Sequence, residues 1–105
     1  MQQHESKFHV GQLIKHLKFG YRGVVYDVDP VFSGTEEWYR TMATSRPPRD
    51  KPWYHVLVDG QQHTTYVAER NLAEDDDGRR IVHPLADTLF SRFENGRYVR
   101  RQAAN

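Results

Sequence analysis

Alternating apolar and polar residues along the chain predict a small β-sheet domain. The clearest alternation covers residues 24–29, where Val24, Tyr26 and Val28 fall on one face of a strand that ends at Pro30. The residues between them fall on the other face, because side chains alternate along a strand. A weaker strand pattern precedes this one and is interrupted by a glycine, which indicates a bulge or bend.

Two aromatic and β-branched runs, 53–58 and 62–68, flank an Asp-Gly dipeptide that is typical of a hairpin turn. In a hairpin whose loop has an even number of residues, paired positions have opposite parity. We therefore expect His55 and Tyr66 to share one face of the hairpin and His63 to lie on the other.

Two segments carry helical patterns. The hydroxyl of Ser33, three residues before Glu36, fits a capping box and predicts a short helix with Trp38, Tyr39 and Met42 on one side. Residues 85–94 repeat large apolar side chains every four positions, up to an Asn-Gly dipeptide. They predict an amphipathic helix of about ten residues.

The connecting segments can be assigned as well. Residues 44–52 are rich in proline and arginine, which excludes a helix or central strand and predicts an exposed basic loop. Residues 68–72 have the pattern of a single helical turn, and residues 81–83 that of a short last strand. Residues 97–105 are expected to form a basic, frayed tail.

The fold class is therefore predicted as mainly β: a small SH3-like β-barrel of about five strands with a short insert helix and a C-terminal amphipathic helix. Three regions follow from these assignments. They are a flexible N-terminus over 1–7, the barrel domain over 8–84, and the C-terminal helix with its basic tail over 85–105.

Composition agrees with one small domain, since the chain has 105 residues, 37% of them hydrophobic, and no cysteine. The lack of cysteine excludes disulfides and thiolate metal sites. No apolar run approaches the ~20 residues that cross a bilayer, so we expect no membrane association. The first seven residues lack the apolar stretch of a signal peptide, which favours a cytoplasmic location.

Motifs for catalysis are also missing from the sequence. It contains neither a glycine-rich phosphate loop nor a nucleophile elbow, and we expect no enzyme activity and no cofactor. The expected hairpin register keeps His55 and His63 from chelating one ion, so no metal site is predicted. Asp27 and Asp29 point the same way along a strand, an arrangement that is more typical of a polar turn than of acid–base chemistry.

The formal net charge of +1 conceals an uneven distribution. Residues 53–77 carry one basic and six acidic side chains, whereas residues 78–105 carry six arginines and two acidic side chains. A solvated surface accounts for such runs, and a basic patch for phosphate or protein partners is the alternative. Electrostatic attraction of the whole chain to duplex DNA is expected to be weak.

Several motifs in order resemble one family. Gly-Val-Val-x-Asp-x-Asp-Pro and Pro-Trp-Tyr-His-Val flank a variable stretch. The matching segments are 8–12, 14–16, 20–30, 52–58 and 65–72. Together they resemble the hemimethylated-DNA-binding, YccV-like domain family, which includes the heat-shock protein HspQ. The resemblance implies an SH3-like barrel without catalytic activity.

The resemblance implies hemimethylated duplex DNA as one partner. Cations would contact phosphates, and aromatic side chains would contact a base or its methyl group. The candidate DNA-binding residues are Lys15, Lys18, Phe19, Tyr21, Arg22, Arg46, Arg49, Arg97, Arg100 and Arg101.

The second implied role is that of a heat-shock-linked adaptor, which promotes degradation of client proteins by an ATP-dependent protease. Aromatic anchors surrounded by arginine would suit a protein partner. The candidates are Trp38, Tyr39, Trp53, His55 and Tyr66. Core packing is the alternative for these aromatic residues, and the sequence does not choose between DNA and the protease. Self-association through the C-terminal helix also stays open.

Overall fold

The computed structural model describes residues 5–101. The elements, in chain order, are β1 (Leu13–His16), β2 (Arg22–Asp29), α1 (Glu36–Met42), β3 (Trp53–Val58), β4 (Thr64–Ala68), the 3-10 helix η1 (Glu69–Asn71), β5 (Leu72–Glu74), α2 (Ala86–Leu89), β6 (Phe90–Glu94) and β7 (Arg97–Arg100). Within the described range, no helix has the length and apolar character needed to span a membrane.

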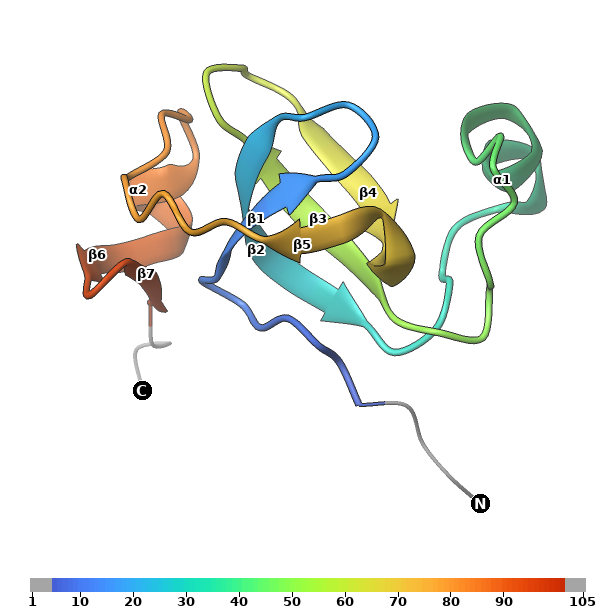
Figure 1. Ribbon diagram of the computed structural model, residues 1–105, viewed down its shortest axis with the longest axis horizontal. Coiled ribbons are helices and arrows are strands. Elements are labelled where there is room, and N and C mark those ends of the chain that lie inside the picture. Colours follow the sequence, from blue (N-terminus) through green and yellow to red (C-terminus); the bar gives the residue numbers. More distant parts are fainter. Residues whose placement is uncertain (1–4, 102–105) are drawn as a thin grey trace.

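The main sheet has five antiparallel strands in the order β4-β3-β2-β1-β5. Its edge strands, β4 and β5, are not hydrogen-bonded to each other, so the sheet is not closed into a barrel. Strands β6 and β7 form a separate two-stranded sheet. Figure 1 shows this hairpin and α1 at opposite sides of the main sheet. The predicted mainly β domain with a short insert helix is confirmed.

A β-bulge in β2 changes the face on which its side chains lie. Val25 pairs with Val56, but the next pair is Asp27 with His55, so Tyr26 is the extra residue. The uninterrupted alternation predicted for this strand is therefore wrong. Beyond the bulge, the carboxylates of β2 lie on the same face as the imidazole of His55, outside the main core.

The hairpin of β3 and β4 has the predicted register. His55 pairs with Tyr66, and the pairing runs on to Leu57 with Thr64, so opposed residues have opposite parity. The predicted adjacency of His55 and Tyr66 is confirmed, with their ring centroids 4.5 Å apart. His63 precedes β4 and is exposed, so its expected place on the other face stays a prediction.

The main sheet buries side chains on both faces. The inner face holds the core cluster Phe8, Ile14, Val25, Tyr54, Val56, Val67 and Leu72. The outer face is covered in two places. The C-terminal segment packs Ile81, Phe90 and Tyr98 against β1–β3, and α1 packs near Trp53 at the other end of β3.

The C-terminal segment differs most from the prediction. Residues 85–94 do not form one helix, because α2 ends at Leu89 and the chain continues into β6. Asn95 and Gly96 have φ values of 55° and 74°, two successive positive values that suit a tight hairpin turn. The dipeptide expected to end a helix is therefore the turn between β6 and β7. The predicted tail is also wrong in part, since it forms β7, while residues 102–105 lie outside the described range.

The β6–β7 hairpin is hydrogen-bonded to the segment that precedes β1. The Tyr98 N–H donates to the Gly11 carbonyl at 2.9 Å. A Cβ at Gly11 would collide with the Tyr98 carbonyl, and the φ of Gly11 is +93°, so glycine is required there. Residues 81–83 do not form the predicted strand. Instead, Ile81 and His83 insert buried side chains from an irregular segment.

The insert helix is confirmed, although its cap is not the predicted residue. The Oγ1 of Thr35, rather than Ser33, accepts the Trp38 N–H at 3.0 Å. The proline-rich loop that follows is only partly exposed, because Pro47 and Pro52 are buried. The single helical turn predicted near residue 70 is confirmed as η1.

Candidate functional site

A hollow of about 410 Å³ opens beside β4, between α1 and the β1–β2 turn. Its lining is rich in aromatic and small side chains. The lining residues are His16, Lys18, Phe19, Tyr21, Trp38, Met42, Ala43, Thr44, Ser45, Pro47, Trp53, His55, Thr64, Thr65, Tyr66, Val67, Ala68 and Asn71. The candidate DNA contacts Lys18, Phe19 and Tyr21 thus share one surface with protein-partner candidates.

Packed aromatic rings form the α1 wall of the hollow. The rings of Trp38 and Tyr66 meet edge to face with centroids 5.6 Å apart, and Trp53 packs beneath both. Trp53 is 1% exposed, and its indole N–H donates to the Pro48 carbonyl at 3.0 Å. Tyr39 is buried as well. Trp53 and Tyr39 therefore support the wall, while Trp38 and Tyr66 present partly exposed surface.

The β1–β2 turn forms the opposite wall. The turn is held by His16, whose Nδ1 accepts the backbone N–H groups of Lys18 at 3.1 Å and Phe19 at 3.0 Å. Phe19 stacks on this imidazole and is 73% exposed. Burial lowers the pKa of His16, and the charge of Lys18 lowers it further. Tyr21 lies deeper, where its hydroxyl is 2.7 Å from the Thr65 hydroxyl.

A polar group lies next to the hollow, where β2 and β3 meet. The Tyr66 hydroxyl donates to Asp29 Oδ2 at 2.7 Å and accepts the Ser33 N–H at 3.0 Å. Burial, and secondly the hydrogen bond to Asp29, raise the pKa of Tyr66 to about 12. These bonds hold the Tyr66 ring in a fixed position.

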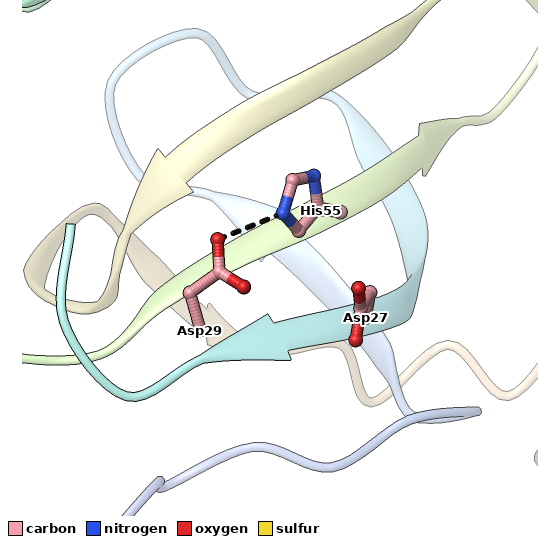
Figure 2. Close-up of side chains that lie close together, drawn as sticks. All are labelled: Asp27, Asp29 and His55. Carbon is pink, nitrogen blue, oxygen red and sulfur yellow. Dashed lines mark hydrogen bonds and ion pairs between the residues drawn. The ribbon is translucent and has the colours of Figure 1, made fainter. Parts of the chain in front are cut away.

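Figure 2 shows Asp27, Asp29 and His55 converging on one face of the sheet. Their ligand atoms lie within 4.8 Å of one another, which is close enough to consider a metal ion. However, His55 Nε2 lies 3.0 Å from Asp29 Oδ2, and Asp27 Oδ1 accepts a backbone N–H. Hydrogen bonds among the described residues account for this arrangement without an ion.

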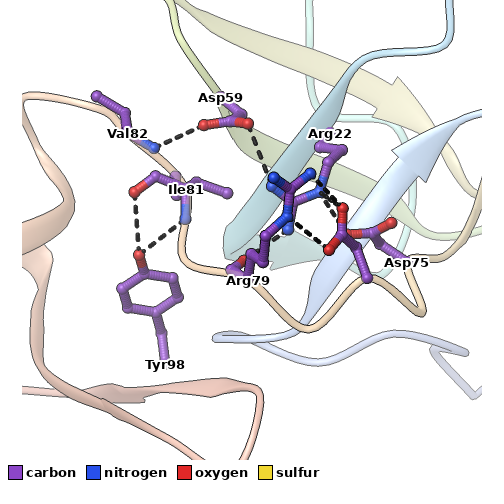
Figure 3. Close-up of polar contacts among 8 residues, drawn as sticks. Arg22, Asp59, Asp75, Arg79, Ile81, Val82 and Tyr98 are labelled. Atoms are coloured by element: carbon purple, nitrogen blue, oxygen red, sulfur yellow. Dashed lines mark hydrogen bonds and ion pairs between the residues drawn. The ribbon is translucent and has the colours of Figure 1, made fainter.

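Arg22 is not free to contact phosphate, although it was a candidate. Its guanidinium donates to Asp75 Oδ2 at 2.6 Å, to Asp59 Oδ2 at 3.2 Å and to the Arg79 carbonyl at 2.6 Å. Only 15% of the side chain is exposed. Figure 3 shows Arg22 between the two carboxylates, and Asp59 also accepts the Val82 N–H. Arg22 therefore joins β2 to the segment that leads into the C-terminal hairpin.

The C-terminal arginines lie on the β6–β7 hairpin and at its end. Arg97, Arg100 and Arg101 are exposed and form no ion pair with a carboxylate of the described residues. Arg101 donates to the Asp87 carbonyl, which leaves its charge uncompensated. By contrast, Arg92 on β6 pairs with Glu94 at 3.1 Å. The free charges of this hairpin are therefore concentrated on and after β7.

The remaining candidate cations lie elsewhere. Lys15 is exposed on β1, and Arg46 is exposed in the loop after α1. Arg49 forms two hydrogen bonds with Glu36 and lies 3.8 Å from the centre of the Tyr39 ring. This pairing raises the pKa of the Arg49 guanidinium and leaves it less available to a phosphate than Lys15 or Arg46.

Two apolar residues at or near the hollow were not among the predicted site residues. Phe32 packs against four aromatic rings of the α1 wall, and Met42 is an exposed apolar lining residue. The helical pattern placed Met42 on the same side as Trp38, although Met42 was not predicted as a contact residue. Phe32 lies close after a proline in a segment without periodicity, so no pattern marked it.

Comparison with known protein families matches residues 6–97 to the family described as YccV-like, "Hemimethylated DNA-binding protein YccV like". The match includes the whole hollow, β6 and the first residue of β7. It covers most of the chain and agrees with the resemblance of the motifs. The chain therefore belongs to the YccV-like family of hemimethylated-DNA-binding proteins.

Proposed function

We propose that the protein is a non-enzymatic module that binds duplex DNA methylated on one strand, with the β6–β7 hairpin as its main contact surface. Family membership supports the ligand. The observation that supports this surface is a two-stranded ribbon whose β7 arginines lack carboxylate partners among the described residues. Free cations contribute affinity for phosphates.

The shape of the ribbon suits the major groove, which admits a two-stranded β-ribbon. Phe90 and Tyr98 are buried and anchor one face on the main sheet. Arg97 and Val99 alternate with Tyr98 and so share the opposite face. Arg100 falls on the Tyr98 side by the same alternation, but it is the last residue of β7 and is exposed. An arginine can bind a phosphate or a guanine edge, and an apolar side chain can contact a methyl group.

The test is a fluorescence anisotropy titration of hemimethylated, fully methylated and unmethylated duplexes. Two sets are needed, one with N6-methyladenine and one with 5-methylcytosine. Arg97→Ala combined with Arg100→Ala should weaken hemimethylated binding about tenfold, which corresponds to about 1.4 kcal/mol. The slope of log affinity against log salt should fall by up to about two, since each phosphate that is no longer neutralised lowers it by about one.

The matched control is Arg40→Ala combined with Lys51→Ala, which removes the same charge from exposed positions on the insert side. It should change affinity much less. Equal binding of all three duplexes would contradict specificity for hemimethylated DNA. An equal loss of affinity with the control pair would contradict the assignment of the hairpin.

We also infer that the main sheet is of the SH3-like type. The strand order β4-β3-β2-β1-β5 supports this classification. Strands β2, β3 and β4 form a three-stranded antiparallel meander, and β1 pairs with both β2 and β5. A cytoplasmic location stays a prediction and is compatible with a DNA partner.

A second candidate function is that of a stress-linked adaptor for an ATP-dependent protease. The hollow favours a protein partner, since its concave aromatic surface has no counterpart in a regular duplex groove. A purified protease should degrade a client at a different rate when this chain is added. An unchanged rate at saturating protein would contradict this candidate.

A further inference from the structure

We propose that β4 is a docking strand, which binds an extended segment of a partner protein by adding it to the main sheet. β4 is the last strand of the sheet and pairs only with β3. No backbone hydrogen bond joins residues 64–67 to any described segment beyond β3. The outer N–H and C=O groups of this strand are therefore available for pairing.

The two edges of the sheet differ in how they are protected. β5 has three residues, and the acidic run 74–77 begins at its end. Short length and charge are common protections against strand addition. β4 has five residues, Thr-Thr-Tyr-Val-Ala, without proline, charge or bulge. Its composition favours a β partner on an edge to which no described backbone is hydrogen-bonded.

The hollow follows this free edge along its whole length. All five residues of β4 are part of the lining. Five residues in a strand extend about 17 Å. The β1–β2 turn and α1 rise on either side of the strand. Because side chains of an added strand would point alternately to the two sides, each wall would receive every second side chain.

The walls indicate which side chains the partner segment carries. Phe19 and Tyr21 on one side, and Trp38 and Met42 on the other, offer apolar and aromatic surface. Lys18 is the only lining residue with a permanent charge, and the lining contains no carboxylate. An extended segment with large apolar side chains at alternate positions and an acidic flank matches this chemistry. This inference goes beyond DNA binding and does not depend on it.

The experiment is selection of a phage-displayed random hexapeptide library on the full chain. We expect enrichment of peptides that alternate aromatic or β-branched residues and carry Asp or Glu at one end. The best peptide is then titrated against the protein by calorimetry and by amide NMR. Its binding should shift the amide signals of residues 64–68.

Backbone pairing is tested on the peptide, where no folding defect can interfere. Methylating the peptide amides that face β4 should reduce affinity at least tenfold, whereas methylating the amides that face solvent should have little effect. On the protein, Phe19→Ser combined with Met42→Ser should weaken binding. Val82→Ser is the control, because Val82 is as exposed as Phe19, at 73%, but does not line the hollow.

Three results would overturn the proposal. The first is failure of the library to enrich any peptide, and the second is equal affinity for peptides methylated on either set of amides. The third is displacement of a selected peptide by the hemimethylated duplex, which would make the hollow a nucleic-acid site. The first two results leave the proposed DNA binding by the arginine hairpin untouched, whereas the third would also count against it.

Discussion

The outer face of the main sheet is covered at its two ends in different ways. At one end, the C-terminal segment closes over Leu13 and Leu57 and places its arginines outside. At the other end, α1 packs on Trp53 but leaves a hollow beside β4. The C-terminal end therefore presents arginines over a packed core, whereas the α1 end presents an open hollow with an apolar lining.

This difference shows that the count of charged residues in a segment does not locate a binding site, because some of those charges are paired within the protein. In the net charge, the acidic segment 53–77 formally offsets the basic segment 78–105. In the structure, Asp59 and Asp75 bind Arg22 instead. Arg97 and Arg100 keep no such partner among the described residues, so equal formal charges differ in their availability to a ligand.

The largest expected effect concerns the α1 end. Trp53→Ala should lower the free energy of unfolding by about 3–5 kcal/mol, because it removes a fully buried aromatic side chain and leaves a cavity. Urea unfolding followed by circular dichroism measures the decrease. A change below about 1 kcal/mol would mean that α1 and Trp53 contribute little to the core.

A smaller effect is expected at the hairpin end. The Tyr98 hydroxyl accepts the buried Ile81 N–H at 3.1 Å. Tyr98→Phe leaves that N–H without its partner and should cost about 1–3 kcal/mol in urea unfolding. Unchanged stability would show that the C-terminal segment is held by apolar packing alone.

The smallest expected effect is a pH dependence of stability that arises from His16, in the wall of the hollow. Burial depresses the pKa of His16, so the folded state prefers the neutral imidazole that accepts two turn N–H groups. Its contribution is complete above the unfolded pKa of about 6.5 and declines as the pH falls below that value. Stability should therefore drop as the pH falls from about 6.5 through the depressed folded-state pKa of His16, and less so in His16→Gln. Identical pH dependence in the two proteins would contradict this role.

The sequence allowed much of the fold to be predicted where local pattern and register coincide. The hairpin of β3 and β4, the insert helix and the pairing of His55 with Tyr66 follow from alternation and turn residues. The bulge at Tyr26 was not predictable, because the residues around it alternate as in a regular strand. The wrong prediction of a helix over residues 85–94 has a similar cause, since Asn95-Gly96 can either end a helix or form a hairpin turn. Burial of Tyr98 on the main sheet favours the hairpin.

The candidate site was predictable as a set of residues but not as a surface. Trp38 and Tyr66 were identified as anchors, and Lys18 and Phe19 as DNA contacts, yet all four line one hollow. Their convergence depends on tertiary contacts between α1, β4 and the β1–β2 turn, which no local pattern encodes. The pairing of Arg22 with Asp75 joins residues 53 positions apart and was equally hidden.

The central claim is that DNA binds the arginine hairpin and not the hollow. The most direct measurement is the affinity for one hemimethylated duplex of two double variants, Arg97→Ala with Arg100→Ala and Phe19→Ser with Met42→Ser. We predict about a tenfold or greater decrease in affinity for the arginine pair, or at least about 1.4 kcal/mol, and little change for the hollow pair. Retained affinity in the arginine pair, together with weakened binding in the hollow pair, would contradict the claim.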